Sequence, residues 1–194
     1  MKILVACEES QALTKEFRLL GHEAYSCDIR PASGGFPEWH IEGDVTGLLN
    51  MGWDLIIGFP PCTYLTRAGS TLLYPQPGVI NNERYEKGLE AREFFMKIWN
   101  ANCDRVAIEN PIPNRIYELP PISQIIQPFE HGHPYSKKTC LWLKGLPPVM
   151  PTELVIGNIK SWVGIKRTAY QRSKTFTGIA KAMADQWHSY LMQN

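Results

Sequence analysis

Residues 56–65, IIGFPPCTYL, place a thiol where an apolar strand must end. Gly58 closes the apolar run, Pro60 and Pro61 stiffen the turn, and Cys62 follows them. A single cysteine more often fills space in a protein core. The alternative is a nucleophile, because the prolines hold the thiol at a fixed, exposed angle beyond the end of the strand.

A carboxylate occupies the equivalent place in a later segment. Residues 105–111, RVAIENP, form an apolar strand in which Glu109 is followed by Asn110 and a proline. A glutamate at a strand end is usually a solvated or capping acid. The carboxyl ends of neighbouring parallel strands share one crevice, so we expect the Cys62 thiol and the Glu109 carboxyl to face one ligand.

The segments that would position these residues alternate between strand and helix. The patterns predict strands over 2–7, 23–29, 40–46, 53–59 and 105–111, and helices over 10–21, 81–102 and 177–193. Continuous apolar strands that alternate with helices indicate an α/β fold, with a mostly parallel sheet and helices on both faces. Asp28 and Asp44 also lie at the ends of predicted strands, and therefore belong at the same edge of the sheet.

Length and composition narrow the class of protein. The 194 residues fit one domain, 1–194, and the net charge of +1 argues against non-specific nucleic-acid binding through bulk charge. A local basic stripe is still compatible with that charge. Five scattered cysteines without a CxxC pair favour reduced thiols, a cytoplasmic location and no metal site. No apolar run approaches ~20 residues, so no membrane segment is expected.

The motifs GFPPCT and IENP resemble the Pro-Cys and Glu-Asn-Val motifs of the DNA cytosine-5 methyltransferases. The resemblance implies a Rossmann-like methyltransferase fold, S-adenosylmethionine as the cofactor and DNA as the partner, with the target base flipped out. The catalytic residues that it implies are Cys62, Glu109 and Asn110. Cys62 would attack C6 of cytosine, Glu109 would hold a proton against N3, and Asn110 would support the loop.

The same resemblance implies two sets of binding residues. Asp28 would meet the cofactor ribose, and Asp44 would approach the adenine ring. The full cofactor set is Cys7, Glu8, Glu9, Ser10, Asp28, Ile29, Asp44, Val45, Gly58, Pro60 and Lys174. The substrate set is Pro61, Thr63, Arg67, Lys137 and Lys138, with the loop over 63–82 closing on the base. Arg67 and the two lysines would otherwise be solvated surface residues.

The chain departs from the family pattern in three places. CEESQ replaces the glycine-rich loop after the first strand, and its acids would bond the cofactor amino group, cap the following helix, or do both. Thr63 stands where the family commonly has a glutamine. Lys174 stands where the family has a Gly-Asn turn. It would touch the cofactor carboxylate, accept a donor with an additional acid group, or point into solvent.

The region of about 112–175 is irregular and too short for a separate target-recognition domain. Its last part carries basic and aromatic residues that suit phosphate contact and base stacking, or form a loose surface segment: Lys160, Trp162, Lys166, Arg167, Tyr170, Arg172 and Lys174. The recognised DNA sequence would then be short, or the specificity would be relaxed or supplied by an accessory subunit or a homodimer. The size suits a compact, phage-type member of the family.

Three functions follow from these residues. The first is methyl transfer to C5 of cytosine in DNA through a covalent Cys62–C6 adduct. The second is the same chemistry on a free pyrimidine nucleotide, or with a carboxylated donor. The third is a non-catalytic relative that binds DNA or another protein. Retention of both Cys62 and Glu109 favours an enzyme, because a binding protein needs neither residue.

Overall fold

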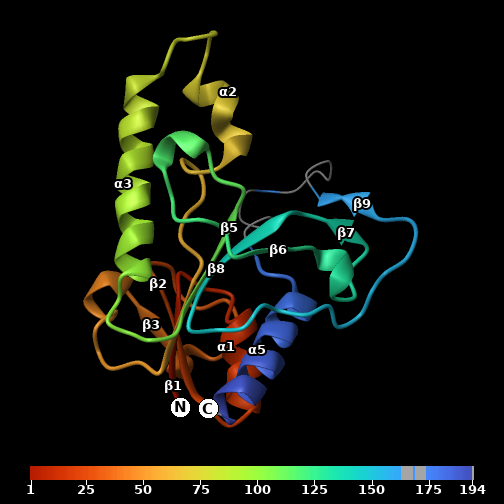
Figure 1. Cartoon of the computed structure of the whole chain (residues 1–194). Helices are drawn as coiled ribbons and strands as arrows, with labels where there is room; N and C mark the ends of the chain where they lie inside the picture. Colours follow the sequence, from red (N-terminus) through yellow and green to blue (C-terminus); the bar gives the residue numbers. More distant parts are fainter. Residues whose placement is uncertain (163–167, 169–173, 194) are drawn as a thin grey trace.

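A seven-stranded sheet forms the centre of the protein, in a computed structural model that describes residues 1–162, 168 and 174–193 (Figure 1). Its strands are β1 (Lys2–Ala6), β2 (Glu23–Asp28), β3 (His40–Glu42), β4 (Leu55–Gly58), β5 (Val106–Pro111), β6 (Gln124–Ile126) and β8 (Thr139–Lys144). The strand order is β3-β2-β1-β4-β5-β8-β6. The expected α/β fold with a mostly parallel sheet is confirmed.

The order of the strands creates a switch point between β1 and β4. The strands β1 to β5 pair in parallel, and the chain proceeds outward from β1 on one side and from β4 on the other. Ligands of open α/β sheets bind outside the carboxyl ends of the strands at such a point. Strand β8 pairs antiparallel with both β5 and β6, an arrangement that the sequence patterns did not predict.

Helices cover both faces of the sheet (Figure 1). Alternate residues of β1 point to opposite faces, so that Ile3 and Val5 pack in one apolar cluster while Leu4 and Ala6 pack in the other. The first cluster includes residues of α1 (Ala12–Leu19) and α5 (Thr177–Leu191), and the second includes residues of α3 (Asn82–Trp99).

The segment after Cys62 is more ordered than the loop predicted over 63–82. A 3-10 helix (Arg67–Gly69) leads into the short α2 (Ser70–Leu73), and α2 packs beside α3. Together α2 and the start of α3 form an arm that projects beyond the sheet (Figure 1). Leu72 and Val79 are exposed on this arm.

The region predicted to be irregular, 112–175, contains further strands. Strand β6 joins the edge of the main sheet, and β7 (Tyr135–Ser136) pairs in parallel with β9 (Lys160–Ser161). The rings of Tyr135, Trp162 and Phe176 pack against one another, which attaches this small sheet to the segment that leads into α5. Four residues of the predicted basic and aromatic set lie outside the described residues: Lys166, Arg167, Tyr170 and Arg172.

A glycine within α3 makes room for a buried ring. A Cβ atom at Gly88 would lie 2.1 Å from Cζ of Tyr117, whose side chain is almost fully buried. Arg92 of α3 donates a hydrogen bond to the Tyr117 carbonyl oxygen at 2.7 Å. Gly88 therefore allows α3 to pack closely on the chain that follows β5.

We expect Gly88→Ala to lower the free energy of unfolding by about 1–3 kcal/mol, because the new methyl group must displace the Tyr117 ring. An alanine in an exposed helix would have the opposite effect. Gly47→Ala is the control, since no atom lies within 4 Å of its added Cβ. Urea denaturation of both variants measures the difference, and an unchanged or raised stability of Gly88→Ala would contradict this packing.

Candidate active site at the carboxyl edge of the sheet

The turn after β4 holds Cys62 at the switch point. The backbone N–H of Phe59 donates to the carbonyl oxygen of Ala6 at 2.9 Å, which ties the start of this turn to β1. The Cys62 carbonyl oxygen accepts from the backbone N–H groups of Leu65, at 3.1 Å, and Thr66, at 3.0 Å. Cys62 is partly exposed, so a ligand at this edge could reach its thiol.

Asn110 joins this turn to the end of β5. Its side chain is fully buried, and Nδ2 donates to the Pro60 carbonyl oxygen at 2.9 Å. Its Oδ1 atom is buried and has no hydrogen-bond partner among the described residues. The contact holds Pro60, two residues before Cys62, against Asn110, the residue that follows Glu109.

The chain beyond each strand end continues this pairing. The Arg67 N–H donates to the Ile112 carbonyl oxygen at 2.9 Å, and the Asn114 N–H donates to that of Leu65 at 2.7 Å. A bridge between Thr66 and Pro113 lies between these two bonds and is antiparallel. The segment after Cys62 is therefore fixed along the segment after Glu109.

Burial raises the pKa of the Glu109 carboxyl, and the positive charge of Lys137 acts against this rise. Lys137 precedes β8 and lies close enough to Glu109 for its charge to be felt. Lys138 is exposed and acts instead on the buried thiol of Cys140. The structure thus brings one of the two predicted lysines to the Glu109 carboxyl.

Three of the predicted cofactor residues share the other half of the edge. Burial raises the pKa of the Cys7 thiol, and the charges of Asp28 and Asp44 raise it further. Asp44 caps a 3-10 helix (Val45–Gly47) through a 2.9 Å bond from the Thr46 N–H, and this bond lowers the pKa of its carboxyl. Val45 is buried beneath the edge, whereas Ile29 is exposed.

The turn after β1 adopts a glycine-like backbone without a glycine. Cys7 has φ of 60° and Gln11 has φ of 56°, in the left-handed region that L-residues rarely occupy. Such conformations cost about 1–3 kcal/mol each and are concentrated at ligand sites. CEESQ therefore adopts, at Cys7 and Gln11, a backbone conformation that glycine would favour.

Glu8 caps the helix that follows. Its buried carboxylate accepts from the Leu13 N–H at 2.7 Å, and from the N–H and hydroxyl groups of Thr14 at 3.2 and 2.7 Å. Burial raises the pKa of this carboxyl to about 7, although the three donors lower it. Of the two interpretations open for Glu8, helix capping is the contact present.

Ser33 links the side chains of Glu9 and Lys174 by hydrogen bonds. The Ser33 hydroxyl donates to the Glu9 carboxylate, and Lys174 Nζ donates to Ser33 Oγ at 3.4 Å. Ser10 lies partly exposed beside this group. Lys174 is thus brought to the turn after β1, where the cofactor residues were predicted.

The remaining predicted residues lie around the Cys62 turn. Pro61, Thr63 and Arg67 are exposed, and Pro60 is buried. A Cβ atom at Gly58 would lie 3.0 Å from Cγ2 of Ile98, so this glycine allows α3 to pack closely on β4.

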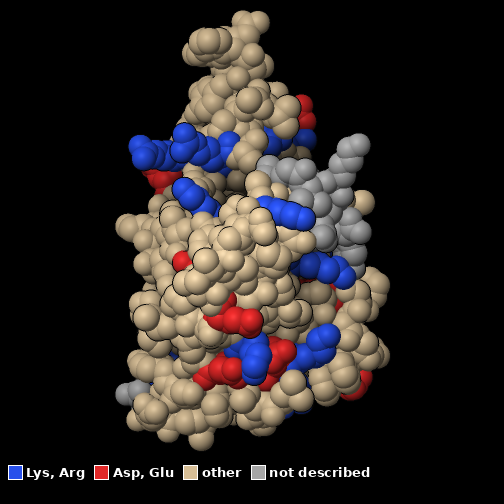
Figure 2. Space-filling model, turned by 90° about the vertical axis from the view of Figure 1, so that its right-hand side faces the viewer, with Lys and Arg blue, Asp and Glu red and all other residues tan. Residues whose placement is uncertain are grey.

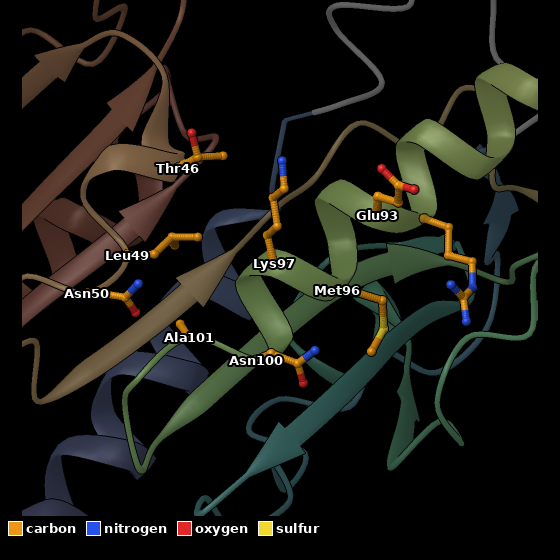
Figure 3. Close-up of a pocket in the computed structure, with 9 residues that line it drawn as sticks. Thr46, Leu49, Asn50, Glu93, Met96, Lys97, Asn100 and Ala101 are labelled. Atoms are coloured by element: carbon orange, nitrogen blue, oxygen red, sulfur yellow. The ribbon is translucent and has the colours of Figure 1, made fainter.

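A hollow of about 470 Å³ lies outside the predicted site (Figure 3). Its lining comes from the segment around Thr46 and Leu49 and from the carboxyl half of α3, including Glu93, Met96 and Lys97. None of the predicted site residues lines it. The charge of Lys97 nevertheless reaches Asp44 and contributes to the lowered pKa of that carboxyl.

Sequence reasoning missed Arg84 and Ser33. Arg84 of α3 donates to the Thr63 carbonyl oxygen, directly after Cys62. The available signal was an arginine in the first turn of a helix, where acids are favoured. Ser33 had no signal in its local sequence, because its partners are far away in the chain.

Within the described residues, no helix is long and apolar enough to cross a membrane. The same part of the chain contains no group of three or more His, Cys, Asp or Glu side chains that could hold a metal ion. A scan against models of protein families and a search of curated proteins found no match to this chain.

Glu8→Gln tests the raised pKa. Because the folded state holds this proton more tightly than the unfolded state, the contribution of Glu8 to stability is present below pH 4.5 and is lost as the pH rises through about 7. The stability of the wild type relative to Glu8→Gln should therefore fall by on the order of 3 kcal/mol between pH ~4.5 and ~8.

Urea denaturation of the two proteins across this range gives the difference, in which the titration of the histidines cancels. A constant difference, or one that increases with pH, would show that the helix donors outweigh burial at Glu8.

Proposed function

We propose that this protein transfers a methyl group from S-adenosylmethionine to C5 of cytosine in DNA. The observation that carries the proposal is the 2.9 Å hydrogen bond from Asn110 Nδ2 to the Pro60 carbonyl oxygen. It joins the turn of a partly exposed thiol, Cys62, to the strand end of a carboxyl with a raised pKa, Glu109. A nucleophile and a proton donor at the switch point of a parallel sheet suit addition to a pyrimidine ring.

The Cys62 thiol and the Glu109 carboxyl would act together in one addition step. The Cys62 thiolate attacks C6 while the protonated Glu109 carboxyl donates a hydrogen bond to N3, which draws electrons from the ring. This addition would make C5 nucleophilic towards the methyl group that S-adenosylmethionine would supply, with S-adenosylhomocysteine as the leaving group. Loss of the C5 proton to a base and cleavage of the C6–S bond would then release Cys62. A carboxyl that retains its proton can play this part, and burial of Glu109 favours that form.

The residues at the other half of the edge fit S-adenosylmethionine, which supplies an electrophilic methyl group when bound. Asp28 and Asp44 carry carboxylates able to accept hydrogen bonds from ribose hydroxyls and from an adenine amino group. The positive φ angle of Cys7 gives the turn after β1 the shape expected at a cofactor. The strand order supports the Rossmann-like methyltransferase fold that the motifs imply.

Several features support DNA as the substrate. Figure 2 shows lysine and arginine side chains across the upper half of one face, below the projecting arm, whereas lower down most of the acidic side chains are mixed with further lysine or arginine side chains. Arg67 and Arg115, which follow β4 and β5, are exposed, as are Lys138 and Lys160 beside the small sheet. A cytosine in a duplex must be flipped out of its stack to reach Cys62, and basic residues around the site would hold the flanking phosphates.

The test is transfer of a labelled methyl group from S-adenosylmethionine to duplex DNA, followed by digestion to nucleosides. We expect the label in 5-methyldeoxycytidine, no transfer by Cys62→Ala, and a rate about 10²- to 10⁴-fold lower for Glu109→Gln. Cys103→Ser, a change at a buried thiol away from this turn, is the control and should retain the activity.

Transfer that persists in Cys62→Ala would contradict the proposed mechanism. Label found only when free pyrimidine nucleotides are supplied would replace DNA by a nucleotide substrate. A folded protein that binds S-adenosylmethionine and transfers nothing would favour a non-catalytic binding protein.

A further inference from the structure

The Cys62 turn is held by side chains at two of its carbonyl groups. On the side before Cys62, Asn110 Nδ2 donates to the Pro60 carbonyl oxygen at 2.9 Å, in the interior of the protein. On the side after Cys62, Arg84 Nη2 donates to the Thr63 carbonyl oxygen at 2.8 Å, near the surface. The two donors come from β5 and α3, so the turn is fixed between two separate elements.

The position of Arg84 is unfavourable for α3 itself. Asn81 caps α3 by accepting the Arg84 N–H at 3.1 Å, which places this arginine in the first turn of the helix. The helix dipole favours acids at that end and disfavours cations. A residue that departs from a local preference in this way is expected to have a compensating contact.

Three features of the chain accommodate the Arg84 guanidinium. Its central carbon lies 5.0 Å from the centre of the Tyr64 ring, in a cation–π contact. A Cβ atom at Gly69 would lie 2.5 Å from Arg84 Nη2, so the guanidinium in this position lies directly over the glycine. The Thr63 carbonyl provides the acceptor. The planar guanidinium thus contacts three positions in the segment that follows Cys62.

We propose that Arg84 is a positioning residue for the Cys62 nucleophile. Its hydrogen bond to Thr63 and its contact with Tyr64 hold the turn in the shape that presents the thiol to the substrate. The inference rests on the proposed function and assigns Arg84 to the same site. A displacement of about 1 Å in a reacting group can cost about 10²-fold in rate, so loss of this contact should act on the chemical step.

A second arginine of α3 provides a matched control. Arg92 donates from Nε to the Tyr117 carbonyl oxygen at 2.7 Å, and is thus also a guanidinium bound to a backbone acceptor. Its acceptor lies beyond the end of β5 and is no part of the Cys62 turn. Arg84→Gln and Arg92→Gln each remove one contact of this kind, and only the first removes it from the turn that holds Cys62.

Hydrogen exchange of the backbone N–H groups of Leu65 and Thr66 reports on the turn directly, because both donate to the Cys62 carbonyl oxygen. In the protein without substrate, we expect exchange at these two positions to be at least about tenfold faster in Arg84→Gln, as for loss of one charge-assisted hydrogen bond. Arg92→Gln should leave it unchanged, and Arg84→Lys, which keeps one charged donor, should lie between Arg84→Gln and the wild type.

Kinetics separate positioning from a contact with DNA. We expect kcat for methyl transfer to fall about 10- to 100-fold in Arg84→Gln with little change in KM for DNA. Unchanged exchange at Leu65 and Thr66, equal effects of Arg84→Gln and Arg92→Gln, or a rise in KM alone with a weaker salt dependence would overturn the proposal. The exchange measurement needs no substrate, so failure of the proposed function would be recognised separately.

Discussion

The hydrogen bond between the Asn110 amide and the Pro60 carbonyl is the contact on which the site depends. Pro60 follows Phe59, whose N–H is bound to β1, and Asn110 lies in β5, so these two bonds together link the ends of three neighbouring strands. It is fully buried, and a buried polar contact of this kind is costly to break. The sheet therefore fixes the start of the Cys62 turn, and Arg84 of α3 holds the residue that follows Cys62.

The turn after β1 complements this arrangement. Here the chain accepts two left-handed residues, Cys7 and Gln11, in place of glycines. The cost is offset by contacts that hold the turn: Glu8 caps α1, and the Gln11 side chain exchanges two hydrogen bonds with the backbone of Phe36. The two turns follow β1 and β4, the strands on either side of the switch point, and are the places proposed for the cofactor and for the nucleophile.

The main elements could be predicted from local sequence. The alternation of apolar strands with helices is a short-range pattern, and it located β1 to β5, α1, α3 and α5 to within a few residues. Cys62, Glu109 and Asn110 were predicted as site residues in the same way, since strand ends and prolines can be recognised locally, and they do lie in β5 or in the turn after β4. Long-range pairing could not be seen: the antiparallel β8, the edge strand β6 and the Ser33 contacts depend on partners far away in the sequence.

The roles of individual acidic and basic side chains could not be predicted from the sequence either. Glu8 and Glu9 look alike in CEESQ, yet one caps α1 and the other bonds Ser33, because the fold brings different donors to each. Arg84 was passed over because a surface arginine on a helix is common, and its acceptor was a backbone carbonyl that no sequence pattern marks. Gly69, which leaves room for it, was likewise only one glycine in a loop.

The most direct measurement is the intact mass of the protein after incubation with S-adenosylmethionine and a DNA duplex that contains 5-fluorocytosine. This base cannot release its C5 substituent, so a thiolate that has added to C6 remains attached. We predict a covalent complex with the mass of the protein, the DNA and one methyl group, and none with Cys62→Ala. No complex from folded protein with bound S-adenosylmethionine, or a complex that persists in Cys62→Ala, would contradict Cys62 as the nucleophile of a DNA cytosine methyltransferase.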